Sequence, residues 1–321
     1  MESLKERLTE NYKAPLATKT ICFKDFTQQL IDDMVSLNQA GNAIIYRTAL
    51  NRLMVYTANT KLKFTDINYK LLVGFKNQLI KDGIKPNSIS NYFRTLRAIY
   101  NKAIKANLVD RSCYPFLEVQ IKTERTAKRA IAIDELVKIA KLPLNPKSQE
   151  WHARNYFLIS FTLRGASFTD LAYLTAANIR KDMLTYKRRK TGKELNIKLH
   201  SITKELFSNY SVSNSKYLLP ILPANIKENG LTAKAIILQW VKTVNKYLDR
   251  LAKRCSIVED VTTYVSRHTW ATTAKRLGYS NELIAEALGH EYGNKITNIY
   301  LDNFDQSLID DVNNRILSFL K

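Results

Sequence analysis

Apolar side chains recur every three or four positions along most of this chain, and that period restricts it to a fold built mainly from amphipathic helices. Four such stripes occur before residue 105, beginning at Phe23, Tyr46, Leu71 and Pro86. Gly41 and Asn42 are expected to end the first helix. Four amphipathic helices in about 90 residues form a compact all-α domain, which we place at residues 21–112. Residues 1–20 lack this period, so we expect a flexible arm there.

A second domain is predicted at residues 130–321, mostly helical with one small β-hairpin. Residues 184–199 alternate between apolar and polar side chains around Gly192, which is typical of a hairpin. Asp134 is expected to cap the first helix of this domain, and Ser280 a later one. Helices are predicted at residues 154–163, 232–252, 267–277, 281–288 and 305–320.

The charge balance indicates the kind of partner. Fifty Lys and Arg residues stand against 29 Asp and Glu, a formal net charge of +21, which favours a polyanion, either nucleic acid or an anionic membrane. No run of about 18 apolar residues occurs, so no transmembrane helix is predicted, and the first residues lack the apolar core of a secretory signal. Three scattered cysteines fit a reducing cytoplasm, and no His or Cys pair has metal-ligand spacing. We therefore expect no metal and no cofactor.

The fourth predicted helix has a second, polar face. It carries Arg94, Arg97, Asn101 and Lys105 at helical spacing. Such a row is either a solvated face or one that contacts phosphates, and the large net charge favours phosphate contact.

A basic connector is predicted between the two domains, at residues 113–129. It shows no apolar period and carries Lys122, Arg125 and Lys128. It is either a plain linker or a strap that lies along a phosphate backbone.

The second domain holds the residue types that metal-free phosphodiester cleavage needs. Negative charge grows on the phosphate oxygens in the transition state, and arginine suits it because its planar fork donates to two oxygens and stays charged. A nucleophile and an acid for the leaving 5′-oxygen complete the requirement. Candidates for these roles occur in the order Arg164, Lys190, Arg267, His290 and Tyr300.

This order resembles the C-terminal catalytic domain of the tyrosine recombinases, the phage integrase family. The helical domain ahead of it resembles the SAM-like core-binding domain of that family, so the resemblance covers both domains. The segments RGASFTDLAYL, YVSRHTWAT and GHEYGNKITNIYL are most similar to integrases of Bacteroidetes mobile elements.

The resemblance implies a site-specific recombinase that integrates, excises or inverts double-stranded DNA. Tyr300 would attack a DNA phosphate and form a 3′-phosphotyrosyl link without metal or ATP, and Lys190 would protonate the leaving oxygen. Arg188 and Arg189, beside Lys190, are further candidates for contact with DNA. The working unit would be a homo-tetramer on DNA, formed from free monomers in the cytoplasm.

Three departures from the family's pattern bear on activity. Tyr264 stands where the family usually has a histidine. A phenol can donate a hydrogen bond to phosphate but is a poor base near neutral pH. We keep Tyr264 among the site residues. Asp170 follows Arg164 by six positions rather than three, and an ion pair between them is the structural alternative for this arginine. The spacing from His290 to Tyr300 is one residue longer than usual. A catalytically impaired DNA-binding accessory protein and a type IB topoisomerase stay open as alternatives.

The last predicted helix ends the chain with an apolar stripe. The stripe consists of Leu308, Val312, Ile316 and Leu320. It either folds back on its own domain or docks on a neighbouring protomer. The family resemblance favours docking in trans, as a helix in a partner's groove.

Overall fold

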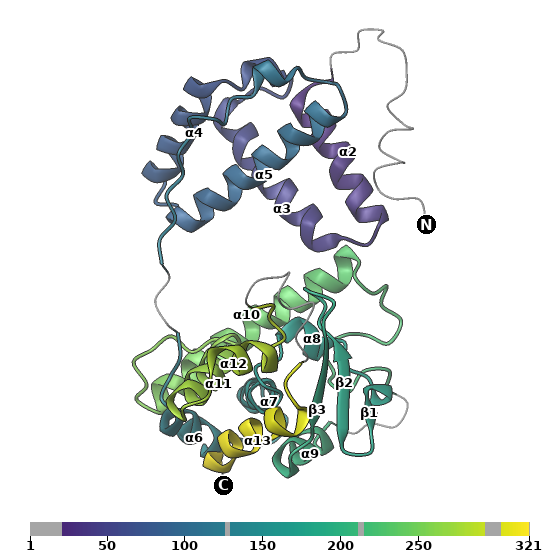
Figure 1. Ribbon diagram of the computed structural model, residues 1–321, viewed down its shortest axis with the longest axis vertical. Helices are drawn as coiled ribbons and strands as arrows, with labels where there is room; N and C mark the ends of the chain where they lie inside the picture. The colour runs from purple at the N-terminus through teal and green to yellow at the C-terminus, as the bar shows by residue number, and fades with distance from the viewer. Residues whose placement is uncertain (1–20, 126–128, 211–214, 293–302, 321) are drawn as a thin grey trace. The chain divides into compact units, whose positions relative to one another are not determined.

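The computed structural model of the chain describes residues 21–125, 129–210, 215–292 and 303–320 (Figure 1). The chain divides into two compact units, one of residues 1–126 with 228–234 and the other of residues 127–227 with 235–321. Each unit is described by itself. The described helices include none that is long and apolar enough to cross a bilayer.

The N-terminal unit contains the four predicted helices. They are α2 (Phe23–Ser36), α3 (Ala40–Thr57), α4 (Tyr69–Lys81) and α5 (Pro86–Lys105), with the short 3-10 turns Phe64–Asp66 and Arg111–Cys113. The first helix ends earlier than expected, because Asn38 adopts a left-handed conformation with φ of 56°. Gly41 and Asn42, which were expected to end that helix, lie instead in the first turn of α3.

An aromatic cluster forms the centre of this unit's core. The Phe64 ring lies 5.2 Å from Phe23, 5.7 Å from Phe26 and 5.4 Å from Tyr100, in edge-on contacts. The Tyr100 hydroxyl donates to the carbonyls of Phe64, at 3.2 Å, and Cys113, at 2.8 Å. Burial raises the pKa of Tyr100 to about 12, so the hydroxyl stays a donor.

The connector differs from the expectation of a plain linker. Phe116 and Val119 are buried in the core of the N-terminal unit, and the Asn87 side chain exchanges two hydrogen bonds with the backbone of Glu124, at 2.9 and 3.1 Å. The segment up to Glu124 is therefore part of this unit. Its apolar residues do not follow a helical period, which is why the sequence pattern did not reveal them.

The C-terminal unit is mostly helical, with one small sheet. Its helices are α6 (Ile133–Lys141), α7 (Gln149–Thr162), α8 (Phe168–Ala172), α9 (Ser201–Ser208), α10 (Leu231–Arg254), α11 (Val265–Arg276), α12 (Asn281–Ala287) and α13 (Gln306–Leu317). The strands are β1 (Ile179–Arg180), β2 (Met183–Lys187) and β3 (Glu194–Lys198), antiparallel in the order β1-β2-β3. The predicted hairpin is confirmed, with Leu184 opposite Ile197 and Tyr186 opposite Leu195.

Helix α7 is the central element of this unit (Figure 1). It contacts α6, α8, α9 and α11, and its residues 155–162 are all buried. A helix that is covered on every side needs no polar face, which explains its weak amphipathic pattern. The preceding helix is not capped as expected, because Ala132 rather than Asp134 is its N-cap residue and Glu135 accepts the Ala132 N–H at 2.8 Å. Ser280 does cap α12, as predicted.

The C-terminal helix α13 packs on its own chain. Val312 and Ile316 are buried, and the Asn313 amide accepts from the Trp270 indole at 2.8 Å and donates to the Thr162 carbonyl at 3.1 Å. The expectation that this helix docks on a neighbouring protomer is therefore wrong. Leu308, at one end of the predicted stripe, is 41% exposed.

The packing of the connector predicts that substitutions at two neighbouring residues, Phe116 and Leu117, have very different effects on stability. Phe116 is 3% exposed and Leu117 is 84% exposed. Phe116→Ala should lower the free energy of unfolding of the N-terminal unit by about 3–5 kcal/mol, because it opens a cavity. Leu117→Ala should change it by no more than about 0.5 kcal/mol. Urea unfolding followed by far-UV circular dichroism measures both, and equal effects would contradict the packing described.

Candidate active site

Arg164 lies in a tight turn at the end of α7. Its φ of 56° and that of Gly165, 69°, are both left-handed, and the turn is closed by the Gly165 N–H, which donates to the Ser160 carbonyl at 2.8 Å. The conformation costs a non-glycine residue about 1 kcal/mol. Its side chain is 2% exposed and points into the unit rather than to solvent. The turn therefore directs a charged side chain inward at the end of a buried helix.

Gly165 allows a close approach of α11 to this turn. A Cβ atom at position 165 would lie 2.4 Å from the Cα atom of Arg267. The hydroxyls of Ser160 and Ser266 also meet, at 2.6 Å. Arg164 and Arg267, far apart in sequence, are thereby brought into one cluster.

Arg267 uses its guanidinium to join three segments. Its Nη1 donates to the Gly165 carbonyl at 3.0 Å, and its Nη2 donates to the Leu288 carbonyl at 2.5 Å. Nη2 also lies 2.9 Å from Nε2 of His290. A guanidinium can only donate, so the imidazole accepts at Nε2 and is neutral.

The surroundings of His290 keep it neutral. Partial burial of the ring and the positive charges of Arg267, Arg188 and Lys190 lower its pKa to about 4. A neutral imidazole has one acceptor nitrogen, and in this arrangement Arg267 occupies it.

Asp310 is the partner of Arg164. Its Oδ1 lies 2.5 Å from Nη2 of Arg164 and also accepts from Nε2 of Gln306 at 2.9 Å. Asp170, the alternative partner considered from the sequence, instead accepts from the backbone N–H of Arg189 at 2.9 Å. The carboxylate that balances Arg164 thus comes from α13 at the other end of the domain.

Part of the Arg164 guanidinium has no partner. Its Nε is buried without a hydrogen bond in the part of the chain that the structure describes. Burial lowers the pKa of Arg164 to about 10, against the attraction of Asp310, so the group stays charged near pH 7. A buried donor left open in this way is suited to an anion that the protein binds.

The basic hairpin lies beside this cluster. Arg188 is buried and its Nη1 donates to the Gly289 carbonyl at 2.7 Å, so its contact with DNA stays a prediction. The Arg189 guanidinium lies over the Tyr173 ring, 3.7 Å from its centre. Lys190 is exposed in the turn, near enough that its charge lowers the pKa of His290.

The remaining predicted residues divide into three groups. Tyr264 is 49% exposed, with its ring 5.0 Å from that of His268, at the start of α11. Arg94, Lys105, Lys122 and Arg125 are exposed on the N-terminal unit, whereas Arg97 is half-buried over Phe116. Tyr300 and Lys128 lie outside the described residues.

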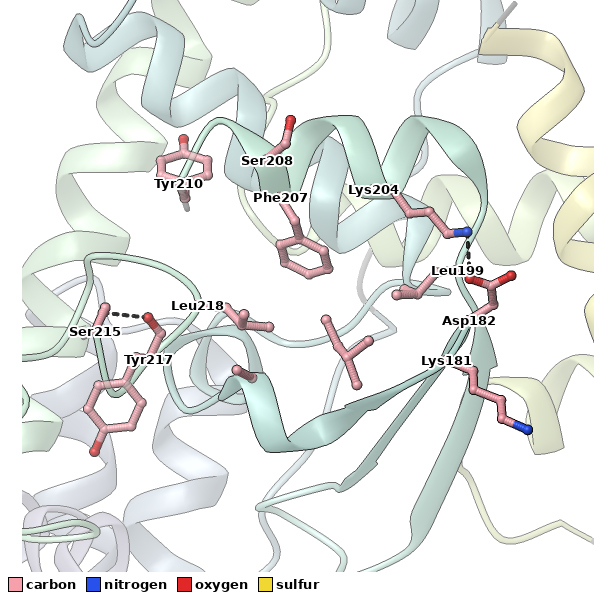
Figure 2. A pocket seen from close by; sticks show the side chains of 12 residues that line it. Lys181, Asp182, Leu199, Lys204, Phe207, Ser208, Tyr210, Ser215, Tyr217 and Leu218 are labelled. Carbon is pink, nitrogen blue, oxygen red and sulfur yellow. Dashed lines mark hydrogen bonds and ion pairs between the residues drawn. The ribbon is translucent and has the colours of Figure 1, made fainter. Parts of the chain in front are cut away.

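Neither a metal-ligand cluster nor the cavity beside β1 and α9 marks another site for this chemistry among the described residues. Among the described residues, no group of three or more His, Cys, Asp or Glu side chains could hold a metal ion. A cavity of about 620 Å³ lies between β1, α9 and the segment after residue 215 (Figure 2). Leu199, Phe207 and Leu218 line it, and Lys204 pairs with Asp182 at 2.7 Å. None of its lining residues belongs to the arginine cluster.

Sequence reasoning named both arginines and His290 but missed Asp310. The signal for it is a charged residue on the buried face of an amphipathic helix, between Ile309 and Val312. A carboxylate in that position needs a cation or several donors, and the helix itself supplies one donor, Gln306.

Two protein-family models match this chain. The phage integrase SAM-like domain matches residues 22–122, and the phage integrase family model matches residues 130–307, more than half of the chain. The chain belongs to the phage integrase family. These are the tyrosine recombinases.

Other integrases and recombinases show the extent of the similarity. A Pseudomonas aeruginosa protein described as the tyrosine recombinase XerC is 25% identical over 114 residues, which are 35% of this chain and 26% of that protein. The structure of a lambda integrase dimer bound to a COC′ core site has 15% identity and a TM-score of 0.60, over 88% of this chain and 98% of that chain. XerH bound to difH has 16% identity and a TM-score of 0.52, over 84% and 77%. At these identities the solved structures show a shared fold, mainly helical with two domains.

The structure of a lambda integrase tetramer bound to a Holliday junction resembles this chain about as closely as the lambda integrase dimer does. Its identity is 15% and its TM-score 0.62, over 93% of this chain and 86% of that chain. The integrase fold of this chain is therefore shared along nearly its whole length.

The depressed pKa of His290 predicts a pH dependence of stability. The unfolded imidazole takes up its proton near pH 6.5 and the folded one near pH 4, so the unfolded state binds more protons between these values. Stability should fall as the pH falls from 6.5 to 4, and His290→Gln should remove part of this fall. NMR titration of the histidine ring protons, assigned with this variant, should give a pKa near 4. A value at or above 6.5 would contradict the geometry.

The Arg164–Asp310 ion pair predicts different effects on stability for substitutions at the neighbouring residues Asp310 and Asp311. Asp310→Asn leaves a buried charge uncompensated and should lower the free energy of unfolding of the C-terminal unit by about 2–4 kcal/mol. Asp311→Asn, on the exposed side of the same helix, should change it by about 0.5 kcal/mol or less. All three tryptophans lie in this unit, so tryptophan fluorescence during urea unfolding reports on it.

Proposed function

We propose that this integrase cuts and rejoins double-stranded DNA at specific sites through a tyrosine–DNA intermediate. The observation that carries the proposal is a cluster of buried arginines whose positive charge is only partly neutralised by nearby carboxylates. Among the described residues, one ion pair, with Asp310, offsets the charge of Arg164, Arg188 and Arg267. The open Nε of Arg164 adds an unused donor. A DNA phosphate supplies the missing negative charge.

Each group has a role in this reaction. Arg164 and Arg267 hold the non-bridging oxygens of the phosphate and stabilise the added charge of the transition state. Tyr300 attacks the phosphorus, forms a bond to the 3′-phosphate and displaces the 5′-oxygen. Nε2 of the neutral His290 takes the proton of the tyrosine once it is released from Arg267, and Lys190 gives a proton to the leaving 5′-oxygen.

The same steps in reverse rejoin the strands. The 5′-hydroxyl of a partner strand attacks the phosphotyrosyl bond, and Tyr300 leaves. The ester conserves the energy of the original bond, so the reaction needs neither ATP nor a metal.

The wider assembly follows from the family. The exposed residues Arg94, Lys105, Lys122 and Arg125 of the N-terminal unit contact the DNA backbone, and a homo-tetramer joins two duplexes, as in the lambda integrase tetramer on a Holliday junction. The protein acts in the cytoplasm on DNA of a mobile element, and the similarity of its motifs to Bacteroidetes integrases supports that setting.

Tyr264 supports a second candidate function. It stands in the family's usual histidine position, and a phenol is a poor base near neutral pH. A chain impaired in this way would bind DNA as an accessory protein without cutting it.

Covalent trapping on nicked DNA separates the two functions. Fragments of the genome that encodes the chain, nicked at random, are incubated with the protein, and potassium–SDS precipitation recovers protein-linked DNA. Wild type and Tyr279→Phe should form an adduct, because Tyr279 lies outside the arginine cluster. Tyr300→Phe should bind DNA equally and form none, because it lacks the nucleophilic oxygen.

Each outcome assigns a function. Specific binding by the wild type without an adduct would support the accessory protein. An adduct with Tyr300→Phe would show that another residue is the nucleophile.

A further inference from the structure

Glu286 is a buried carboxylate in an unfavourable place. It lies in the last turn of α12, where the negative end of the helix dipole repels it, and it is 6% exposed. No ion pair offsets its charge within the described part of the chain. A buried charge without a counter-ion persists when hydrogen bonds stabilise it.

Two hydrogen bonds reach Glu286 from separate points of the chain. The Tyr292 hydroxyl donates to Oε2 at 3.1 Å, and the backbone N–H of Phe304 approaches the same oxygen at 3.3 Å. The rings of Tyr292 and Phe304 lie 6.4 Å apart. Burial and the neighbouring Glu286 raise the pKa of Tyr292, so its hydroxyl keeps its proton and stays a donor.

These two points flank the nucleophile proposed above. Residues 293–303 lie between them, and Tyr300 is one of these residues. One carboxylate oxygen therefore joins the chain just before this segment to the chain just after it.

The carboxylate also sits next to the arginine cluster. The turn that follows α12 presents the Leu288 carbonyl to Arg267 and the Gly289 carbonyl to Arg188. Bonds to Glu286 therefore fix both ends of the segment 293–303 to the same turn that carries His290.

We propose that Glu286 is a positioning residue for the nucleophile, which clamps both ends of the segment 293–303 to the α12 turn. This inference rests on the proposed function. Glu286 does not touch the phosphate; it raises the fraction of molecules in which Tyr300 can reach it. Loss of one hydrogen bond to a charged group, about 1.5–3 kcal/mol, corresponds to a ~10-fold to ~100-fold loss of that fraction.

The test measures the rate of adduct formation at saturating protein on the nicked DNA that the wild type cuts. Glu286→Gln keeps the size of the side chain and removes its charge, and Tyr292→Phe removes the donor from the other side. Glu282→Gln, exposed in the first turn of the same helix, is the matched control. Dissociation constants for DNA and thermal midpoints are recorded for every variant.

We expect Glu286→Gln to slow adduct formation ~10-fold or more, with a dissociation constant within ~2-fold of wild type. Tyr292→Phe should slow it also, and the double variant should be no slower than the slower single variant, because both changes weaken the same hydrogen bond. Glu282→Gln should match wild type. A merely structural role would lower the thermal midpoint and leave the rate at saturation unchanged.

Three results would overturn the inference. One is that Glu286→Gln forms the adduct at the wild-type rate. Another is that the rate losses of the two single variants add in the double variant. If Glu286→Gln does not fold, a wild-type rate for Tyr292→Phe decides against the clamp. Failure of the proposed function looks different, because then the wild type itself forms no adduct.

Discussion

The guanidinium of Arg267 is the interaction on which the C-terminal unit's site depends. It is buried, and it donates to Gly165 at the end of α7 and to Leu288 at the end of α12 while contacting His290. Leu288 is the C-cap residue of α12, whose last carbonyl groups have no partner within the helix, and Gly165 lies in the turn that follows α7. The bonds of Arg267 to these two carbonyls also bring the site residues together. The approach requires glycine at position 165, since any side chain there would overlap α11.

The electrostatics of the site follow from that packing. Arg164, Arg188 and Arg267 are taken out of water, which lowers the pKa of Arg164 and Arg267, yet one carboxylate pairs with them among the described residues. Partial burial and the positive charges of Arg267 and Arg188 lower the pKa of His290 and keep it neutral. A phosphate entering the cluster would restore charge balance and meet donors that are already in place, so little reorganisation is needed.

The C-terminal helix packs on its own unit, whereas its apolar stripe was interpreted as a surface for a neighbouring protomer. Its buried face contains Asp310 and Asn313 as well as aliphatic residues, and each polar side chain finds its partner within the same unit. Docking in cis therefore supplies the counter-charge of Arg164. The helix follows the segment that carries Tyr300, so its attachment and the bonds to Glu286 both act on the chain around the nucleophile.

The sequence by itself determined the helical class, the hairpin and the order of the charged residues. Periodic apolar positions predict which face of a helix is buried, and they located α2 to α5 and α10 to α13 because each helix shows its own pattern. They did not reveal Phe116 and Val119, whose burial follows no period, or the earlier end of α2 at Asn38. Only the tertiary structure decided which charges meet: Arg164 with Asp310 rather than Asp170, and Glu286 with both Tyr292 and Phe304. A local pattern shows that a residue is turned inward, but its partner depends on how helices distant in sequence pack together.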